Sequence, residues 1–344
     1  MNVGVIIPLY NGELWIEEAL DSVLAQSLRP DAIIVVDDGS SDRSPELVRA
    51  YSDVKLIPND GKGSSVARNT GLRHLQTRYV AFLDQDDVWH ASHLRVLVDL
   101  LEECPTANTA IAAASCFTNS APDFTFDVGK VSENDPWKSY PFTIGVEGPS
   151  VAVHRTEAIA EVGLWEECAT GMGDALLFLK LATLHPLIRT PARTVGKRIH
   201  ASQQWLQVRE LGSSYLGFRH DVMCRALDFR RRFAPKEPQL PQFARRLEAL
   251  LTLQKLTSGI QEERLGDVTP IAQRLEEQIG CDPPQFVPHA FYCLMGALFK
   301  TYDVDVLRRQ RDQVFHSMLE CWPEDAVATR LAMQGMIGEQ PLVS

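Results

Sequence analysis

The chain has 344 residues, of which 45% are hydrophobic and 23% charged, a composition typical of a globular protein long enough for two domains. No apolar run approaches the roughly 20 residues that span a bilayer, so the composition excludes a membrane-spanning protein as well as a disordered one. Lys and Arg number 34 against 45 Asp and Glu, a net charge of −11, and nucleic acid is therefore not an expected partner.

The start of the chain and its cysteines both favour a cytoplasmic protein. Residues 1–8 run directly into an apolar, strand-like stretch without the basic and long apolar regions of a secretory signal. The seven cysteines are odd in number, widely spaced and form no CxxC pair, which favours reduced thiols over disulfides or a structural zinc site. We expect a cytoplasmic protein that is either free or attached to the inner face of a membrane.

Up to about residue 200, β-rich runs alternate with amphipathic helical stretches, the pattern of βα units around a mostly parallel sheet. The strands are predicted at Val3–Ile7, Ala32–Val36, Val54–Ile57, Tyr79–Leu83, Ala110–Cys116 and Val151–His154. Leu14–Leu24 places its apolar residues at helical spacing. Ser44-Pro45 predicts an N-cap followed by proline at the first position of a helix that runs through Tyr51. The predicted fold class is α/β.

After about residue 205, strand signals stop and prolines separate helical stretches. We predict two domains, residues 1–215 and an all-helical domain of residues 216–344. A basic stretch in the second domain contrasts with the acidic chain; it contains Arg219, Arg225, Arg230, Arg231, Arg232, Lys236, Arg245 and Arg246. It predicts either a solvated helix face, which is the preferred interpretation, or a docking face for phosphates, an acidic partner or an anionic membrane.

Polar clusters follow three of the predicted strands, where an open parallel sheet binds its ligands. The first strand leads into Pro8–Gly12, the second into Asp37–Asp42 and the fourth into Asp84–Asp87. No GxGxxG or P-loop sequence is present, so phosphates must be held in another way. Asp84 and Asp86 offer one, because two carboxylates at a strand end can bind a divalent cation that bridges to a diphosphate. Alone, this DXD pattern is also typical of solvated turn carboxylates.

In this order, Pro8–Asn11, Val35–Asp42, Ala67–Gly71 and Phe82–Asp87 resemble the family 2 glycosyltransferases, inverting enzymes of the GT-A fold. The resemblance covers about residues 1–205, and it implies a GT-A domain in front of the helical C-terminal domain. It also implies that four residues line the nucleotide pocket: Pro8, Tyr10, Asp38 and Arg68. By the same resemblance Asp84 faces the donor ribose and the metal, and Asp86 is the principal protein ligand of Mn²⁺ or Mg²⁺.

The chemistry of these side chains agrees with such a pocket. Asp38 can accept a hydrogen bond from the N3–H of a pyrimidine base, Arg68 can donate to a base carbonyl or a phosphate, and the ring of Tyr10 can lie against the base. For Asp37 and Asp42 we expect local hydrogen bonds within the turn instead.

Gly171–Ala182 is similar to the family's catalytic Glu-Asp pair at the start of an amphipathic helix, with Gly173 in place of the glutamate. Asp174 is therefore the candidate base, with N-capping of the helix as its structural alternative. The departure at Gly173 keeps Glu166 and Glu167 as alternative bases.

The stretch around His200 resembles the family's Arg-x-His-x-x-Ser sequence loosely, so His200 is either a structural histidine or a further contact of the metal or the diphosphate. Together these features predict a hexosyltransferase that moves a sugar, with inversion and metal assistance, from a nucleotide-diphosphate donor to an acceptor hydroxyl. A UDP-sugar is the favoured donor, and a glycan or lipid-linked glycan is the expected acceptor. The C-terminal domain is expected to contact a membrane or a protein. The alternatives are a non-catalytic nucleotide-sugar-binding or scaffold protein and a nucleotidyltransferase.

Overall fold

The computed structural model describes residues 2–118, 122, 124, 129–138, 148–167, 172–200 and 213–261. The chain divides into two compact units, residues 1–138 with 144–203 and residues 139–143 with 204–344. Helix α8 (Ser213–Phe233) spans the boundary predicted at residues 215 and 216. Because residues 262–344 lie outside the described part, the all-helical domain of residues 216–344 stays a prediction.

A mixed sheet of nine strands forms the centre of the first unit. Its strands lie in the order β3 (Lys55–Pro58), β2 (Ala32–Asp37), β1 (Val3–Leu9), β4 (Tyr79–Phe82), β8 (Ala152–Arg155), β6 (Thr109–Phe117), β9 (Leu187–Arg198) and β5 (Val88–Trp89), with β7 (Ser132–Asn134) paired to β9. The first four strands are parallel to one another, whereas β8 is antiparallel to both of its neighbours. The predicted α/β class is confirmed.

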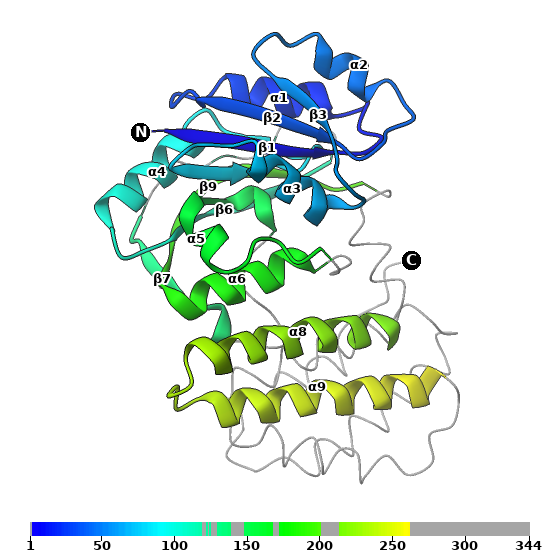
Figure 1. Ribbon diagram of the computed structural model, residues 1–344, viewed down its shortest axis with the longest axis vertical. Helices are drawn as coiled ribbons and strands as arrows, with labels where there is room; N and C mark the ends of the chain where they lie inside the picture. Colours follow the sequence, from blue (N-terminus) through cyan, green and yellow to red (C-terminus); the bar gives the residue numbers. More distant parts are fainter. Residues whose placement is uncertain are drawn as a thin grey trace, which may run out of the picture. The chain divides into compact units, whose positions relative to one another are not determined.

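The chain reverses its direction of travel across the sheet between β1 and β4. Strands β1, β2 and β3 follow one another outward, and the next connection returns to the other side of β1. With right-handed connections, helices α1 (Ile16–Leu24) and α2 (Ser44–Arg49) lie on one face and α3 (Ser64–Arg73) on the other, as Figure 1 shows. Ligands of open α/β sheets bind beyond the carboxyl ends of strands at such a switch point.

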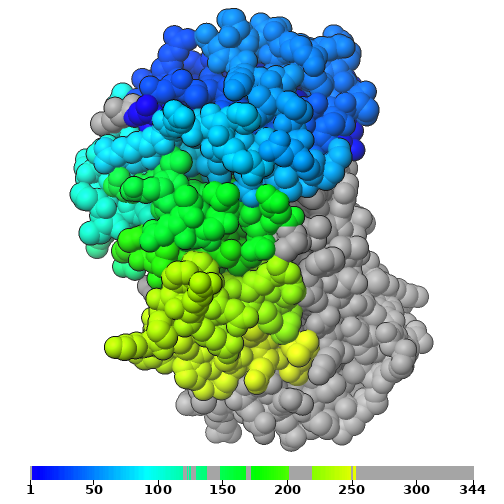
Figure 2. All heavy atoms as spheres, viewed as in Figure 1, coloured from blue at the N-terminus to red at the C-terminus, as the bar shows by residue number. Residues whose placement is uncertain are grey.

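The inner strands can be recognised in the sequence because helices cover both faces of the sheet, so the side chains on both faces are apolar. Val3, Val5, Ile6 and Ile7 of β1 are completely buried, so the strand is a nearly unbroken apolar run rather than an alternating one. The other helices in the described part of the first unit are α4 (His93–Glu103), α5 (Thr156–Glu161) and α6 (Gly173–Leu184), with short 3₁₀ turns at Pro136–Lys138 and Pro149–Val151. In the space-filling view, the blue atoms of the N-terminal elements and the green atoms around α5 and α6 form one continuous surface (Figure 2).

All six predicted strands are present, with ends shifted by one or two residues, whereas β5, β7 and β9 are strands that the sequence did not predict. The predicted N-cap at Ser44 is wrong. Ser44 is the first residue of α2 and Arg43 is the N-cap, because the hydroxyl and the backbone N–H of Ser44 both donate to Asp42. Pro45 still lies in the first turn, where its missing N–H costs nothing.

The second unit contributes the helical pair α8 and α9 (Leu240–Gln261), which lie side by side (Figure 1). Leu227 of α8 and Phe243 of α9 are among its buried side chains. Arg219, Arg230 and Arg246 of the basic stretch are buried as well, and Arg230 forms an ion pair with Glu237 at 3.0 Å. The preferred interpretation of the basic stretch as a solvated helix face is thus wrong for these three arginines, whereas the other five basic residues are exposed: Arg225, Arg231, Arg232, Lys236 and Arg245. None of the described helices is long and apolar enough to cross a bilayer.

Candidate functional site

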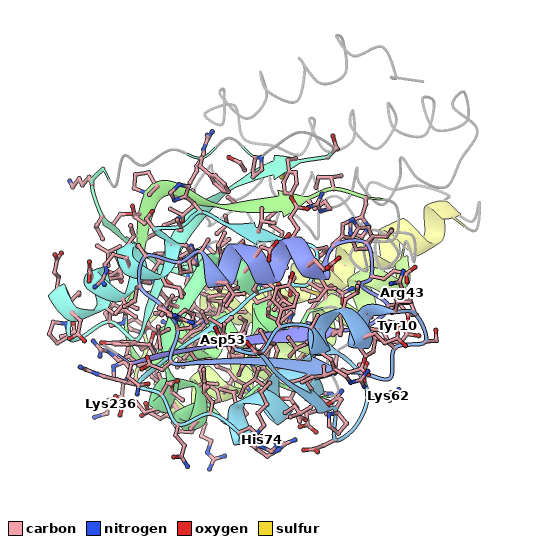
Figure 3. All side chains as sticks on the ribbon, turned by 90° about the horizontal axis from the view of Figure 1, so that it is seen from above. Tyr10, Arg43, Asp53, Lys62, His74 and Lys236 are labelled. Atoms are coloured by element: carbon pink, nitrogen blue, oxygen red, sulfur yellow. The ribbon has the colours of Figure 1, made fainter. Side chains whose placement is uncertain are left out.

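Gln85 joins the loop that follows β1 to the loop that follows β4. Its side-chain oxygen accepts the N–H of Tyr10 at 2.8 Å, and its side-chain nitrogen donates to the carbonyl of Tyr10 at 2.9 Å. The backbone of Tyr10 is thereby fixed, while its side chain is 57% exposed. Tyr10, Arg43 and Lys62 lie at the same end of the strands (Figure 3). Gln85, the middle residue of the DXD sequence, thus holds the backbone of the neighbouring loop in place. The ring of Tyr10 remains available to a ligand.

Asp38 lies at the same edge, directly after β2. Its two carboxylate oxygens accept hydrogen bonds from the Asn59 side chain and from the backbone N–H of Gly63, both at 2.8 Å. Lys62 donates to the backbone carbonyl of Asp38 at 2.8 Å. An ionised carboxylate has about four acceptor positions, so Asp38 retains acceptor capacity for a base N–H. Pro8, the remaining residue assigned to the pocket, is half-buried opposite Val36 of β2.

The two other aspartates of this loop form the turn contacts expected of them. Asp37 accepts the backbone N–H of Ser40 at 3.0 Å. Asp42 accepts the backbone N–H groups of Glu13 and Ser44, both at 3.0 Å, so it fastens the β1–α1 loop to the start of α2. Burial would raise the pKa of Asp42, but these hydrogen bonds hold it below its ordinary value.

Arg68 and Asp84 form an ion pair at the switch point of the sheet. Arg68 of α3 is 7% exposed and its Nη2 lies 2.7 Å from Oδ1 of Asp84, the residue that follows Leu83 at the end of β4. The guanidinium also lies over the ring of Trp165, 4.5 Å from its centroid. The backbone N–H of Asp84 donates to the hydroxyl of Ser150 at 3.1 Å. Two of the predicted site residues are thus in contact.

Asp86 and His200 form the second contact between predicted site residues. Nε2 of His200 lies 2.8 Å from Oδ2 of Asp86, and the imidazole lies against Trp15 in a tilted arrangement with ring centroids 4.1 Å apart. Arg198 donates to the backbone carbonyl of Asp86 at 3.1 Å, which aligns the end of β9 with the loop after β4. The side chains of Asp86 and His200 are both about four-fifths buried, with 20% and 15% exposed.

A carboxylate and an imidazole are a donor pair suited to Mn²⁺, and the carboxylate suits Mg²⁺. In the part of the chain that the structure describes, no group of three Asp, Glu, His or Cys side chains is arranged to hold a metal. Asp86 and His200 therefore fit a cation that takes its other ligands from a diphosphate and water, as divalent cations in phosphate-binding sites commonly do.

Half-buried Lys197 and buried Asp87 form an ion pair that the sequence did not predict as part of the site. Asp87 is 1% exposed, accepts the hydroxyl of Ser150 at 2.6 Å, and lies 3.2 Å from Nζ of Lys197. The same ammonium lies 4.0 Å from Asp84. Burial raises the pKa of Asp87 although Lys197 opposes the shift. Burial alone would lower the pKa of Lys197, but the charges of Asp87 and Asp84 raise it. The ammonium is therefore a fixed positive charge at this edge.

Asp174 is the second residue of α6, and Met172 rather than Asp174 is the N-cap of that helix. Its Oδ1 accepts the N–H of Ala175 at 2.8 Å. Burial raises the pKa of Asp174, and the nearby Asp84 adds to this shift, whereas the charges of Arg68 and Lys197 oppose it. These interactions place Asp174 in the same electrostatic environment as the residues at the end of β4.

Gly173 and the two alternative candidates for the base, Glu166 and Glu167, have different surroundings. A Cβ at Gly173 would lie 2.5 Å from the hydroxyl oxygen of Ser65, so α3 leaves no space for the glutamate that the family resemblance implies. Glu166 forms an ion pair with Lys180 of α6 at 3.1 Å. Glu167 accepts a hydrogen bond from the Asn69 side chain at 3.0 Å, which places it beside the helix that carries Arg68.

The family model described as Glycosyl transferase family 2 matches residues 4–163. The Escherichia coli UDP-Glc:alpha-D-GlcNAc-diphosphoundecaprenol beta-1,3-glucosyltransferase WfgD is 39% identical over 102 residues, which are 29% of this chain and 40% of that protein. Glycosyltransferase GlyA of Streptococcus pneumoniae is 33% identical over 130 residues, 37% of this chain and 18% of that protein. The chain spans less than half the length of these curated relatives.

Two solved structures share the fold. S. aureus TarS 1-349 in complex with UDP-GlcNAc has a TM-score of 0.62 and 17% identity, with 91% of this chain and 92% of that chain covered. The mannosyltransferase PcManGT from Pyrobaculum calidifontis, in complex with GDP-Man and Mn²⁺, has a TM-score of 0.52 and 19% identity, with 96% and 87% covered. At these identities the likeness shows the fold alone.

The family match begins in β1, ends in the turn after α5, and includes every strand-end cluster that the sequence singled out. The mixed, helix-flanked sheet agrees with the GT-A transferase structures. Residues 4–163 thus match glycosyl transferase family 2, and the first unit has the GT-A fold.

Proposed function

We propose that this protein transfers a sugar from a nucleotide-diphosphate donor, with a UDP-sugar favoured, to a hydroxyl of a glycan or lipid-linked glycan. The observation that supports this proposal most strongly is the convergence of Arg68, Asp84, Asp86 and His200 at the switch point of the sheet, with Asp174 in the same electrostatic environment. The named donors of the relatives, UDP-Glc for WfgD and UDP-GlcNAc in the TarS complex, favour uridine nucleotides.

The donor binds along the carboxyl ends of β1, β2 and β4. The exposed ring of Tyr10 lies against the base, Asp38 accepts the base N–H, and Pro8 supports the floor of the pocket. Arg68 donates to a base carbonyl or a phosphate while its other contact holds Asp84 toward the ribose.

Asp86 and His200 would hold Mn²⁺ or Mg²⁺ between the protein and the diphosphate. When bound, the cation neutralises the negative charge that develops on the leaving nucleoside diphosphate. Lys197, fixed by Asp87 at 3.2 Å, adds a positive charge at the same edge. The chain's own residues thus hold the diphosphate and compensate for part of its charge.

Asp174 is the general base of the transfer. It accepts the proton of the acceptor hydroxyl while the hydroxyl oxygen forms a bond to the anomeric carbon and the bond from that carbon to the diphosphate oxygen breaks. This single displacement inverts the anomeric centre and forms no covalent intermediate on the enzyme. The raised pKa of Asp174 makes it a stronger base than an ordinary aspartate once it is ionised.

The name of WfgD describes a diphosphoundecaprenol-linked acceptor, which favours a lipid-linked glycan for this chain too. An acceptor of that kind would place the enzyme in the cytoplasm at the inner face of a membrane, with the residues after about 215 contacting the membrane or a protein there.

A thermal-shift measurement with nucleotides tests the donor site. With UDP at 100 times its Kd and Mn²⁺ present, binding should stabilise the folded state by about 2.7 kcal/mol, which corresponds to about 5–10 °C in Tm for a unit of this size. Asp86→Asn should abolish the Mn²⁺-dependent part of this shift. The matched control is Asp53→Asn, which changes an exposed aspartate that Figure 3 shows away from Tyr10 and which should leave the shift intact.

Turnover separates the proposal from its alternatives. Incubation with UDP-sugars and an acceptor should release free nucleoside diphosphate in a reaction that Asp86→Asn abolishes. Release of pyrophosphate would instead indicate a nucleotidyltransferase. Donor binding without any release would indicate a scaffold protein and would overturn the proposed transfer.

A further inference from the structure

Trp165 lies directly behind the arginine of the donor site. Its ring centroid is 4.5 Å from the guanidinium carbon of Arg68, and both side chains are more than nine-tenths buried. The indole in turn contacts Phe82 of β4 edge to face, with ring centroids 5.1 Å apart. The guanidinium is therefore held between an aromatic face and the carboxylate of Asp84, which it contacts at 2.7 Å.

The backbone of Trp165 is held by the residue next to Arg68. The side chain of Asn69 accepts the N–H of Trp165 at 3.0 Å and donates to its carbonyl at 2.9 Å. Because Asn69 and Arg68 are neighbours on α3, this pair of hydrogen bonds ties the backbone of Trp165 to the helix that carries the guanidinium. Their relative placement is thus set by one rigid element.

The turn before Trp165 adopts an uncommon conformation. Gly163 and Leu164 have φ values of +86° and +66°, and a leucine in the left-handed region costs of order 1 kcal/mol or more. The N–H of Leu164 bonds to the carbonyl of Ile159 in α5 at 2.9 Å, which closes the turn. Such strain persists where the surrounding structure fixes the conformation, and it occurs most often at functional sites.

Trp165 also lies beside the start of the helix that carries the candidate base. A Cβ placed on Gly173 would be 3.7 Å from Cε3 of Trp165. Asp174 follows Gly173 directly, so the indole that contacts Arg68 also lies beside the first turn of the helix that carries the candidate base.

We propose that Trp165 is a positioning residue of the transferase site, whose ring face fixes the guanidinium of Arg68 for the nucleotide and whose edge supports the first turn of α6. This inference rests on the proposed function, because it assigns to Arg68 a contact with the nucleotide. An aromatic ring is sufficient for this role, whereas an aliphatic side chain is not.

The structure offers a matched pair of substitutions. Nε1 of Trp165 is buried and has no hydrogen-bond partner among the atoms around this described residue. Trp165→Phe therefore removes no hydrogen bond and keeps an aromatic face under Arg68, whereas Trp165→Leu removes that face. Loss of a desolvated cation–π contact should weaken UDP binding about 10- to 30-fold in Trp165→Leu, while Trp165→Phe stays within about 3-fold of the wild type.

A double-mutant cycle with Arg68→Gln distinguishes positioning from packing. Isothermal titration calorimetry of the full chain with UDP and Mn²⁺ gives Kd for the wild type, each single variant and the double variant, and the Tm of each establishes that it is folded. In the Arg68→Gln background, Trp165→Leu should weaken UDP binding less than about 3-fold, because the guanidinium that it positions is gone. Trp165→Met, which fills the volume, replaces the leucine variant if that variant does not fold.

The possible results of these measurements distinguish a failure of the positioning role from a failure of the proposed function. Additive effects of Trp165→Leu and Arg68→Gln would overturn the positioning role. A Trp165→Phe variant that binds UDP as weakly as Trp165→Leu would also overturn it, because an aromatic face under Arg68 would then not be sufficient. A wild-type protein that binds no nucleotide would instead refute the proposed function itself. We expect Trp165→Phe to retain UDP binding. We also expect the effect of Trp165→Leu on UDP binding to be largely lost in the Arg68→Gln background.

Discussion

Acidification should destabilise the first unit through two buried histidines, and His154 offers the clearer test. His154 is fully buried in β8, and its Nδ1 lies 2.9 Å from the hydroxyl oxygen of Thr109. The ring centroids of Phe82 and Phe178 lie 5.9 and 5.5 Å from that of its imidazole. Burial lowers its pKa from 6.5 to about 3. His93 has the same shift for the same main cause.

The direction of this pH effect follows from comparing the pKa of His154 in the folded and the unfolded chain. Because the folded pKa of His154 is the lower one, the unfolded chain takes up the proton first, so the stability is complete above about pH 6.5 and is lost as the pH falls toward 3. Between pH 7.5 and 5.0 one such histidine costs about 2 kcal/mol of the free energy of unfolding. Asp87 and Asp174 have raised pKa values and act in the opposite direction, which partly offsets the loss.

Urea unfolding at pH 7.5 and 5.0, followed by near-UV circular dichroism, should show this difference between the wild type and His154→Gln. The variant should lose about 2 kcal/mol less on acidification, since the contributions of all other groups are common to both proteins and cancel. His74→Gln, at an exposed histidine labelled in Figure 3, should keep the wild-type pH dependence. Equal pH dependence of the wild type and His154→Gln would refute the reasoning.

Two further substitutions test the packing of the site. Lys197→Met should destabilise the protein by about 3 kcal/mol in urea unfolding, because it leaves buried Asp87 without its ion-pair partner, and adding Asp87→Asn should recover most of the loss. Gly173→Ala should lower stability by about 1–3 kcal/mol, because the new Cβ would meet the Ser65 hydroxyl oxygen at 2.5 Å. In a Ser65→Ala background the same change should be nearly neutral in thermal unfolding.

The inner strands of the sheet could be predicted from the sequence because the pattern that identifies each of them lies within the strand itself. Helices cover both faces of β1, so its residues are apolar almost without interruption. Strand β9 is different, since it contains Pro191 and Gly196, which normally interrupt strands. Its pairing with β6 shifts register near Ala113, and a Cβ at Gly196 would collide with Val88 and Pro122. These causes are tertiary, so no local pattern predicts the strand.

The same distinction applies to the candidate site. Asp84 and Asp86 directly follow a predicted strand, so their place at the sheet edge could be predicted from the chain order alone. Lys197 is at the end of the strand that the sequence did not predict. Its partner Asp87 belongs to a strand-end cluster in which the sequence assigned roles only to Asp84 and Asp86. Ser150, which accepts the N–H of Asp84 and donates to Asp87, is far from both in the sequence. Side chains that stabilise other site residues over long sequence distances have no spacing by which to recognise them.

The assignment of Asp174 as the base depends on charge rather than on capping, and Asp174→Asn separates the two. Asparagine can still accept the N–H of Ala175, which Asp174 accepts at 2.8 Å, so helix α6 and the affinity for the donor should be retained. Loss of a general base should lower kcat by about 10²–10⁴-fold, as measured by release of nucleoside diphosphate at saturating donor.

The comparison variant is Glu167→Gln, in which the amide oxygen still accepts the Asn69 side chain. In the wild type, kcat/KM should fall as the pH drops below a pKa higher than the usual 3.8 of aspartate, because burial favours the protonated form of Asp174, which cannot accept the acceptor's proton. If Asp174→Asn keeps its activity while a folded Glu167→Gln loses it, the base is Glu167. The hydrogen bond of Glu167 to Asn69, beside Arg68, would then be the contact that positions it.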